Sequence, residues 1–291
     1  MSLHRQLQQR AANHQPIRVV IIGAGKFGAM YLSQVPRTPG VHLVGIADLS
    51  IEQARTNLAR VGWPAHQASA KSLDDAFKQG LTYLTQDWQS LVSHPMVDVV
   101  VECTGNPIAA VEHCLAAFAH GKHVVNVTVE ADAFCGPLLA RKASDAGLVY
   151  SMAFGDQPAL ICDLVDWART CGFPVTAAGR GHKWLPHFCE STPETVWGYY
   201  GLTPEQAQRG GLNPKMFNSF LDGSKPSIEC TAVANATGLV PDIRGMHGVQ
   251  TTQKNAVRDF GAVFSRTGLV DYSLGGDFGG GVCVIGRCFD W

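Results

Sequence analysis

The stretch IRVVIIGAGKFG, residues 17–28, is the part of this chain that decides its fold. Its apolar, β-branched first half predicts a buried parallel strand. Gly23, Gly25 and Gly28 then follow with the spacing G-x-G-x-x-G. In this pattern the first glycine permits a tight turn and the second lets a pyrophosphate approach the backbone. The third glycine lets the next helix pack close to the strand.

A helix is expected directly after these glycines, because Met30, Tyr31 and Val35 are spaced like one helix face. The helix N-terminus offers unpaired N–H groups and a partial positive charge to phosphates. The residues predicted to hold a dinucleotide are therefore Gly23, Ala24, Gly25, Lys26, Phe27 and Gly28. The alternative is a glycine-rich turn in another kind of α/β protein.

A second apolar strand, residues 41–47, ends at Asp48. An acid at this point, about twenty residues beyond the glycines, is expected to bind the adenosine ribose hydroxyls. The same carboxylate would repel the 2′-phosphate of NADP(H), and the nearest arginine is Arg55. The sequence therefore predicts an NAD(P) cofactor and favours NAD(H).

Strand and helix patterns alternate as far as residue 151. Helices are expected over 51–60, 71–79, 88–92, 108–120 and 136–146, and strands over 81–84, 97–105, 122–127 and 148–151. The apolar strand 97–105 ends in Cys103, Thr104 and Gly105, which are expected to contact the cofactor near the nicotinamide. The fold class predicted is α/β, with a Rossmann-type doubly wound parallel sheet over 1–152 and an α/β catalytic domain over 153–291.

Composition excludes some partners. The 291 residues carry 23 Lys and Arg against 24 Asp and Glu, so no basic field attracts nucleic acid or an anionic membrane. The polar N-terminus has no signal-peptide core, and no apolar run is long enough to span a membrane. The nine cysteines form no CxxC pair, and this pattern favours reduced thiols over disulfides. We expect a cytoplasmic homo-oligomer that acts on a small molecule.

The second half has a different character. Helices are expected over 159–171, 213–220 and 227–236, a strand over 174–178, one short helix within the irregular stretch 185–215, and a turn at 222–225. A polar, glycine-rich stretch over 179–183 follows the strand, and residues 234–248 are dense in chemically active groups. The apolar strand 282–291 finishes at the end of the sequence, so we expect the catalytic domain to continue in a longer protein.

Three of these stretches carry a family resemblance. They are NVTVEAD (126–132), GDQP with GRGHK (155–183) and ANATGLVPDIRGMHG (234–248). With them the chain resembles the 1-deoxy-D-xylulose-5-phosphate reductoisomerase-like oxidoreductases, often labelled predicted homoserine dehydrogenases with a C-terminal SAF domain. The likeness covers nearly the whole chain.

The resemblance implies a Rossmann domain, a central α/β catalytic domain and a further C-terminal region that this sequence lacks. It also implies an NAD(P)-linked oxidoreductase. One group of relatives isomerises and reduces deoxyxylulose phosphate with NADPH, and Asp48 departs from the small residue that NADPH enzymes prefer.

Lys183 is the first catalytic candidate, because it follows a strand within a glycine-rich stretch and an ammonium there can polarise a carbonyl or hold a phosphate. A solvated surface lysine is the alternative. Glu130 and Asp132 follow a strand whose carboxyl end faces the expected crevice, and either is a base, a metal ligand or a cap for the helix near Gly136. Asp156 is a further candidate, or the cap of the next helix.

Asp242, His247 and Asn235 lie in the segment that is most specific to the family. Glycines and a proline around them predict an irregular backbone held for a purpose. His182 and His187 could join Glu130 in a metal site, but no ligand spacing supports one, so no metal is predicted.

The function expected is an NAD(P)-dependent oxidoreductase acting on a small hydroxylated or phosphorylated carbonyl substrate. One alternative is a homoserine dehydrogenase-like dehydrogenase. The other is a nucleotide-sensing module that keeps the Rossmann unit without turnover.

Overall fold

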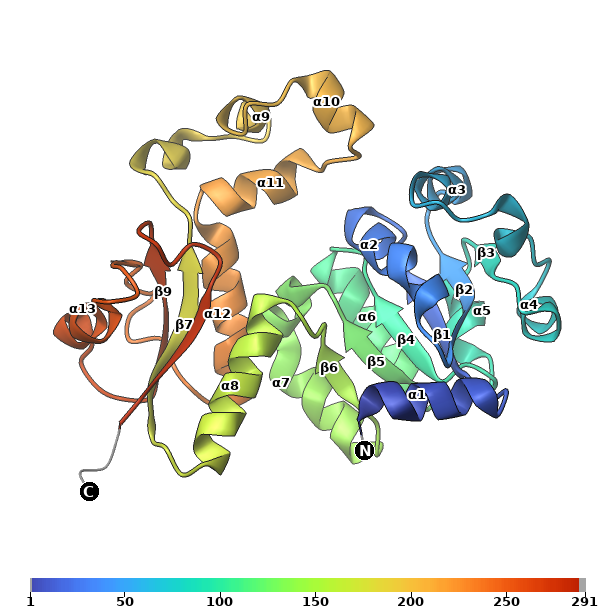
Figure 1. The fold of residues 1–291 in the computed structure, drawn as a ribbon, viewed down its shortest axis with the longest axis horizontal. Helices are drawn as coiled ribbons and strands as arrows, with labels where there is room; N and C mark the ends of the chain where they lie inside the picture. The colour runs from blue at the N-terminus through green and yellow to red at the C-terminus, as the bar shows by residue number, and fades with distance from the viewer. Residues whose placement is uncertain (1, 288–291) are drawn as a thin grey trace. The chain divides into compact units, whose positions relative to one another are not determined.

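A computed structural model describes residues 2–287 of the chain (Figure 1). These residues divide into two compact units. Unit 1 comprises the described residues up to Ala131 together with Leu138–Ser151, and unit 2 comprises Asp132–Pro137 and the described residues from Met152 onward. The predictions for Cys288 and for the end of strand 282–291 lie outside the described residues.

Unit 1 is built on a parallel sheet. Within residues 2–287 it has six strands in the order β3-β2-β1-β4-β5-β6. The strands are β1 (Ile17–Ile22), β2 (Val41–Ala47), β3 (Tyr83–Thr85), β4 (Val99–Glu102), β5 (His123–Asn126) and β6 (Tyr150–Met152). The pairs β1·β2, β1·β4, β2·β3 and β4·β5 are parallel. This order is that of the Rossmann fold, so the predicted doubly wound sheet is confirmed.

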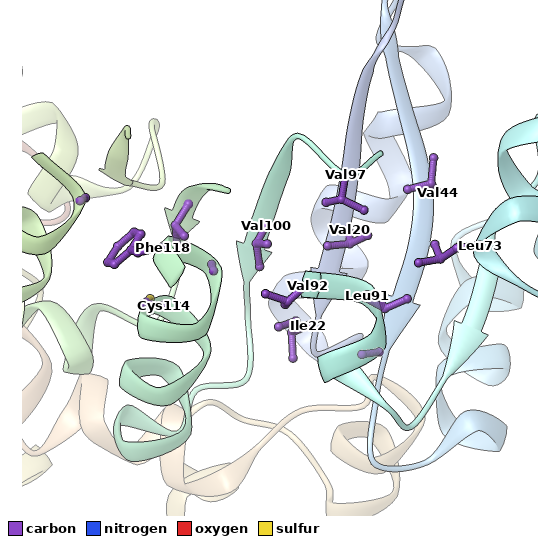
Figure 2. Close-up of a cluster of buried hydrophobic side chains, with 14 of the residues drawn as sticks. Val20, Ile22, Val44, Leu73, Leu91, Val92, Val97, Val100, Cys114 and Phe118 are labelled. Carbon is purple, nitrogen blue, oxygen red and sulfur yellow. The ribbon is translucent and has the colours of Figure 1, made fainter. Parts of the chain in front are cut away.

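Helices cover both faces of this sheet. The helices of this part of the chain are α1 (Leu3–Ala12), which has no buried residue and lies beside the strand ends, α2 (Lys26–Gln34), α3 (Ile51–Arg60), α4 (Leu73–Gln79), α5 (Trp88–Ser93), α6 (Pro107–Ala119) and α7 (Val129–Asp145), with 3-10 turns η1 (Val35–Arg37) and η2 (Ala65–Ala68). Because side chains alternate along a strand, Val20 and Ile22 of β1 enter one buried cluster (Figure 2) and Val19 and Ile21 enter another. The sheet is thus buried on both sides, as expected of a parallel sheet.

Two helix predictions in this unit need correction. In α2 the buried residues are Gly28, Ala29 and Leu32. Of the predicted face, Tyr31 and Val35 join the buried cluster, whereas Met30 is 54% exposed, so the prediction was wrong at Met30. The helix predicted over 136–146 is only the second part of α7, which begins at Val129 and has a non-helical residue at Cys135. The sequence suggests a start near Gly136 because Pro137 cannot donate a backbone hydrogen bond and breaks the helical pattern.

Unit 2 contains a mixed sheet. Among the described residues its strand order is β10-β7-β9-β8. The strands are β7 (Val175–His182), β8 (Val249–Gln250), β9 (Leu269–Leu274) and β10 (Val282–Gly286). Strand β10 runs antiparallel to β7, while β7 and β8 both run parallel to β9.

Each face of the unit 2 sheet has its own helical cover (Figure 1). Helices α8 (Gln157–Thr170) and α12 (Ser224–Thr237) pack on one face through Ile161 and Val233, against Val270 of β9. Helix α13 (Ala256–Val263) contributes Phe260 to the cluster on the other face. The remaining elements are η3 (Pro186–Glu190), α9 (Val196–Tyr199), α10 (Pro204–Arg209) and α11 (Pro214–Leu221).

Three predictions in unit 2 were wrong in detail. The strand predicted over 174–178 continues as β7 to His182, so the glycine-rich stretch is sheet rather than loop. The stretch 185–215 contains η3, α9 and α10 instead of a single helix, and α12 begins at Ser224 inside the predicted turn. No helix within residues 2–287 is long and apolar enough to cross a membrane.

Candidate functional site

The glycine loop after β1 has a backbone that requires glycine at two of its three positions. Gly23 has φ +95°, and a Cβ there would lie 2.8 Å from the Cys103 carbonyl group. A Cβ at Gly28 would lie 2.4 Å from the Gly23 carbonyl oxygen. A Cβ at Gly25, in contrast, would meet nothing within 4 Å. The loop is therefore packed tightly at its first and third glycines and open at its second.

Asp48 follows β2 and lies against this loop. Its Oδ2 accepts a hydrogen bond of 2.8 Å from the Ala24 N–H, and its Oδ1 accepts one of 2.9 Å from the Ser50 N–H. The buried Asn57 side chain of α3 donates to the Ala24 carbonyl oxygen at 2.8 Å. Ser50 also caps α3 by accepting from the Gln53 N–H. The carboxylate is thus fixed beside the residues predicted to hold a dinucleotide.

A fully buried carboxylate, Glu102, ends β4 just before the predicted nicotinamide contacts. Its Oε1 accepts from the Thr104 hydroxyl at 2.6 Å and lies 3.1 Å from His113 Nδ1. Its Oε2 accepts from the Thr128 hydroxyl, which in turn accepts from the Gly105 N–H at 3.0 Å. This network holds the Cys103–Gly105 turn at the carboxyl edge of the sheet, where ligands bind in open α/β sheets.

Cys103 itself is unsuited to nucleophilic work. Its side chain is buried, and burial together with the nearby Glu102 carboxylate raises the pKa of its thiol far above neutrality. Burial and the neighbouring Cys103 also raise the pKa of Tyr31 to about 12. Both groups therefore remain protonated at neutral pH, and the thiolate is the form of cysteine that reacts.

The structure places the candidate acids of the middle segment on helix starts. Glu130 lies in the first turn of α7, and Asp132 follows in the same helix. Asp156 is the N-cap of α8 and accepts a hydrogen bond of 3.0 Å from the Gln157 N–H. Asn235 of α12 donates through Nδ2 to the carbonyl oxygens of Asp132 and Ala133, at 2.8 and 3.0 Å.

Lys183 directly follows β7 and is exposed. The glycines before it have a structural reason, because a Cβ at Gly179 would lie 1.7 Å from the Asp271 carbonyl oxygen. A Cβ at Gly181 would lie 1.8 Å from the Phe278 carbonyl oxygen. These glycines therefore leave no room for a ligand, since neighbouring backbone fills the space beside them.

Asp242 and His247 come together with a third residue, Asp271 of β9. His247 Nδ1 lies 2.9 Å from Asp271 Oδ2, and the N–H groups of His247 and Gly248 also donate to that carboxylate. His247 Nε2 lies 3.8 Å from Asp242 Oδ2. Hydrogen bonds from the Ser265 hydroxyl and N–H lower the pKa of Asp242, and His247 adds to the effect. The imidazole is thus held between two carboxylates.

A second buried cluster lies on the α12 side of the same sheet. Arg180 of β7 donates to Glu229 of α12, and both side chains are buried. Lys225 lies one helical turn before Glu229, with its Nζ 3.8 Å from the carboxylate. Burial lowers the pKa of His182, and the charge of Arg180 lowers it further.

A pocket of about 410 Å³ opens at the carboxyl ends of β8 and β9, one residue beyond Lys183. It is lined by Trp184, Pro186, Gln250, Thr251, Thr252, Asn255, Asp259, Leu274, Gly275 and Gly276. Asp259 of α13 accepts from the Thr251 hydroxyl at 2.7 Å, which fixes one polar wall. An aromatic side chain and several amide and hydroxyl groups thus face a common space.

The histidines considered as metal ligands have separate partners in unit 2. His182 Nε2 faces the Phe220 carbonyl oxygen, while the His187 ring stacks on Tyr199 with centroids 5.9 Å apart. Within residues 2–287, no three His, Cys, Asp or Glu side chains form a cluster suited to a metal ion.

The sequence analysis missed Glu102, His113, Arg180, Glu229 and Asp271. Two of them carry a detectable signal, since Glu102 and Asp271 are charges inside otherwise apolar strand patterns. Such residues are almost never fully buried unless they are paired. His113, Arg180 and Glu229 carry no such signal, because helix and strand patterns tolerate them on an exposed face.

Two family descriptions match the chain. Residues 17–126 match "Oxidoreductase family, NAD-binding Rossmann fold", the GFO/IDH/MocA family. Residues 155–290 match "Oxidoreductase DRL, catalytic domain". No curated protein matches the sequence. The expectation of a Rossmann domain is confirmed, and both matching descriptions are of oxidoreductases.

The chain is similar to several solved structures at low sequence identity, and one of them, with a TM-score above 0.5, supports the same fold. A homoserine dehydrogenase from Thiobacillus denitrificans is 20% identical, with a TM-score of 0.52, over 78% of this chain and 50% of that one. An NAD-binding oxidoreductase from Klebsiella pneumoniae is 21% identical, with a TM-score of 0.43, over 72% and 54%.

A third similar structure is a myo-inositol dehydrogenase from Lactobacillus casei, in complex with NAD(H) and myo-inositol. It is 14% identical, with a TM-score of 0.42, over 62% of this chain and 50% of that one. The chain thus spans about half the length of each of these proteins. By its two family matches, the chain is similar to NAD-binding oxidoreductases, with residues 17–126 like the Rossmann domain of the GFO/IDH/MocA family and residues 155–290 like the catalytic domain of the DRL oxidoreductase.

Proposed function

We propose that this protein is an NAD(P)-dependent dehydrogenase that acts on a small hydroxylated or phosphorylated carbonyl compound. The observation that carries the proposal is the glycine loop of unit 1, open at Gly25 and closed by backbone at Gly23 and Gly28. That combination leaves room for a pyrophosphate only where the nucleotide-binding pattern requires it.

NAD(H) is the cofactor that these residues fit better. Asp48 presents a carboxylate beside Ala24, where an acid suits free ribose hydroxyls and repels a 2′-phosphate. Ala24, Lys26 and Phe27 complete the loop and helix start that would hold the phosphates. The bound nicotinamide supplies hydride acceptance or donation, and the protein contributes orientation and charge stabilisation.

Unit 2 supplies the groups proposed for catalysis. Lys183 is the leading candidate to polarise the substrate carbonyl or hold a phosphate, since it follows β7 next to the Trp184 pocket. His247 is proposed to move the proton of the hydroxyl group, with Asp271 holding its ring through Nδ1. Three acids are weaker candidates. Asp242 already accepts a hydrogen bond from the Ser265 N–H, and Asp156 caps α8 by accepting from the Gln157 N–H. Glu130 lies in the first turn of α7.

Narrower assignments rest on single observations. The match to the DRL catalytic domain favours a reductoisomerase-like reaction on a sugar phosphate, but Asp48 argues against the NADPH that this reaction uses. The homoserine dehydrogenase from Thiobacillus denitrificans shares only the fold with this chain, so it supports that substrate weakly. A cytoplasmic homo-oligomer remains part of the proposal.

The test is a dehydrogenase screen of the full-length protein with both cofactors. Polyols, sugar phosphates including deoxyxylulose phosphate, and hydroxy acids including homoserine are the substrates. We expect turnover with NAD+ or NADH on one of these classes. Tight NADH binding without turnover on any of them would instead favour the nucleotide-sensing module.

A matched pair of glycine variants tests the site itself. Gly25→Ala has room for its methyl group, so it should fold normally and weaken NADH binding by about tenfold or more, because the methyl group obstructs the pyrophosphate. Gly198→Ala also has room, outside the loop, and should change neither property. Unchanged NADH affinity in Gly25→Ala would remove this loop from the cofactor site.

A further inference from the structure

A pocket of about 720 Å³ lies in unit 1, at the edge of the sheet opposite to the glycine loop. It lies at the amino ends of the strands, where β1 begins at Ile17, β4 at Val99 and β5 at His123. Helix α1 passes beside these strand ends (Figure 1). The lining residues are Arg10, His14, Gln15, Pro16, Ile17, Arg18, His42, Phe77, Met96, Asp98, Val99 and His123.

The acid in this lining is already neutralised. Arg18 donates to both oxygens of Asp98, through Nη2 at 2.7 Å and through Nε at 2.9 Å. Burial works against ionisation of Asp98, but the hydrogen bonds and charge of Arg18 hold the pKa of this carboxyl below its usual value. Because the charge of Arg10 also lowers the pKa of Asp98, this single carboxylate faces two guanidinium groups, and the lining keeps a net positive charge beside its imidazole groups.

The histidine at the start of β5 has a defined proton position. His123 Nδ1 accepts the Val149 N–H at 3.0 Å, so the neutral ring carries its proton on Nε2 and can donate from there. Arg10 donates through Nη1 to the Gln15 carbonyl oxygen at 3.2 Å, which ties its guanidinium to the rim of the pocket. A guanidinium has further N–H groups in a planar fork that suits carboxylate and phosphate.

The end of α1 carries an independent signal. The Gln15 N–H bonds to the Arg10 carbonyl oxygen and the His14 N–H to that of Ala11, which is the Schellman arrangement of a helix end. The residue in its left-handed position is His14, with φ +54°, where glycine is the usual choice. A histidine here adopts a backbone conformation that costs less for glycine, and strain of this kind is concentrated at ligand sites.

We propose that this pocket binds a small anion bearing a carboxylate or phosphate group, at a site separate from the cofactor loop. Arg10, His14 and His123 would donate hydrogen bonds to the anion. Those from the charged Arg10 guanidinium are the strongest, because a hydrogen bond gains strength when its donor and acceptor are ionised. Phe77 and Met96 form an apolar wall for the rest of the ligand. Such a ligand would join α1 to the strand ends.

The test uses the full chain at constant ionic strength, because surface charge effects are screened by salt. Inorganic phosphate and succinate are titrated separately by calorimetry, and the histidine imidazole signals are followed by NMR. NADH is present at saturation so that the glycine loop is occupied, and the Gly25→Ala variant repeats the titration. The variants are Arg10→Gln and His14→Gly, with Arg60→Gln on the far end of α3 as the control.

We expect at least one of the two probes to bind and to shift the His14 and His123 signals. Arg10→Gln should weaken binding by about tenfold or more, as expected for the loss of one charge-assisted hydrogen bond. His14→Gly should weaken binding while raising the midpoint of thermal unfolding, because glycine relieves the strained φ. Arg60→Gln and Gly25→Ala should change anion affinity by less than about twofold.

Opposite signs for stability and binding in His14→Gly separate a ligand site from a structural role. The proposal is overturned if neither anion binds, or if Arg10→Gln and His14→Gly bind as the unmodified protein does. It is also overturned if Gly25→Ala abolishes the titration, since the anion would then occupy the cofactor loop. The result does not bear on the proposed dehydrogenase function, because no step of that function uses this pocket.

Discussion

At the scale of single residues, Asp48 shows how a carboxylate is placed before any ligand arrives. It bonds to the Ala24 and Ser50 N–H groups, so its orientation is fixed by the backbone that surrounds the glycine loop. Each carboxylate oxygen has two acceptor positions, and one on each remains for ribose hydroxyls. The same placement makes a second negative charge nearby unfavourable.

The first prediction concerns this residue. The unmodified protein should bind NADH more tightly than NADPH, because Asp48 accepts the ribose hydroxyls and repels a 2′-phosphate. Asp48→Ala should reduce the ratio of NADPH to NADH dissociation constants by about tenfold. Fluorescence titration with both cofactors measures the change, and Glu52→Ala on the neighbouring helix α3 is the control. Tighter NADPH binding by the unmodified protein would contradict the prediction.

Lys183 supports a second prediction, which rests on the proposed function. Lys183→Ala should leave NADH affinity unchanged and lower turnover by about a hundredfold, as expected when one catalytic charge is removed. Steady-state kinetics measure the loss once the screen has found a substrate. The exposed Lys215 of α11 supplies the control, since Lys215→Ala should keep normal turnover. Near-normal turnover in Lys183→Ala would make Asp242 and His247 the leading candidates.

At the scale of elements, β7 shows why a glycine-rich pattern was misjudged. Glycine lowers strand propensity, so Gly179 and Gly181 suggest a loop when the chain is considered alone. In the sheet, β7 lies between β9 and β10, and backbone approaches both glycines closely. Glycine inside a strand commonly marks such an approach. The element thus depends on neighbours that are far away in sequence.

The third prediction rests on the close approach of backbone to Gly181. Gly181→Ala should lower the free energy of unfolding by about 2 kcal/mol or more, because its Cβ would meet the Phe278 backbone and neither strand nor loop yields easily. Urea unfolding followed by tryptophan fluorescence measures the loss. Gly198→Ala, where the Cβ meets nothing within 4 Å, should be neutral or slightly stabilising. Equal stability of the two variants would show that β7 and its partner move apart at little cost.

At the scale of the whole molecule, buried titratable groups link stability to pH. Burial and the Arg180 charge lower the pKa of His182, so the unfolded chain binds a proton on this residue more readily than the folded chain does. Stability therefore rises with pH wherever the two states differ in bound protons. The contribution is complete above the unfolded histidine pKa of about 6.5 and is lost as pH falls through the lower, folded value.

The fourth prediction follows from that sign. The free energy of unfolding should fall between about pH 7 and pH 5, and His182→Gln should make the fall smaller. Urea unfolding at half-unit pH steps measures both slopes. His66, which is exposed, gives the matched control, because His66→Gln should leave the slope unchanged. A slope in His182→Gln equal to that of the unmodified protein would exclude His182 as its source.

The sequence by itself determined the Rossmann half and the position of its proposed cofactor loop. Strand period, the glycine spacing and Asp48 are local signals. The strands of a parallel sheet buried on both faces are nearly continuous apolar runs, which a single sequence shows directly. The cap at Asp156 was predictable for the same reason, because a cap depends on residues one to three positions away.

Only the tertiary structure decided the side-chain groupings of unit 2, including the one proposed for catalysis. His247 meets Asp271 because β9 lies beside the segment before β8, and Arg180 meets Glu229 because α12 covers β7. It also decided that Gly179 and Gly181 belong to a strand, and that His14 and His123 share a pocket. Such pairings depend on register and packing between distant segments, which leave no periodic trace in a single sequence.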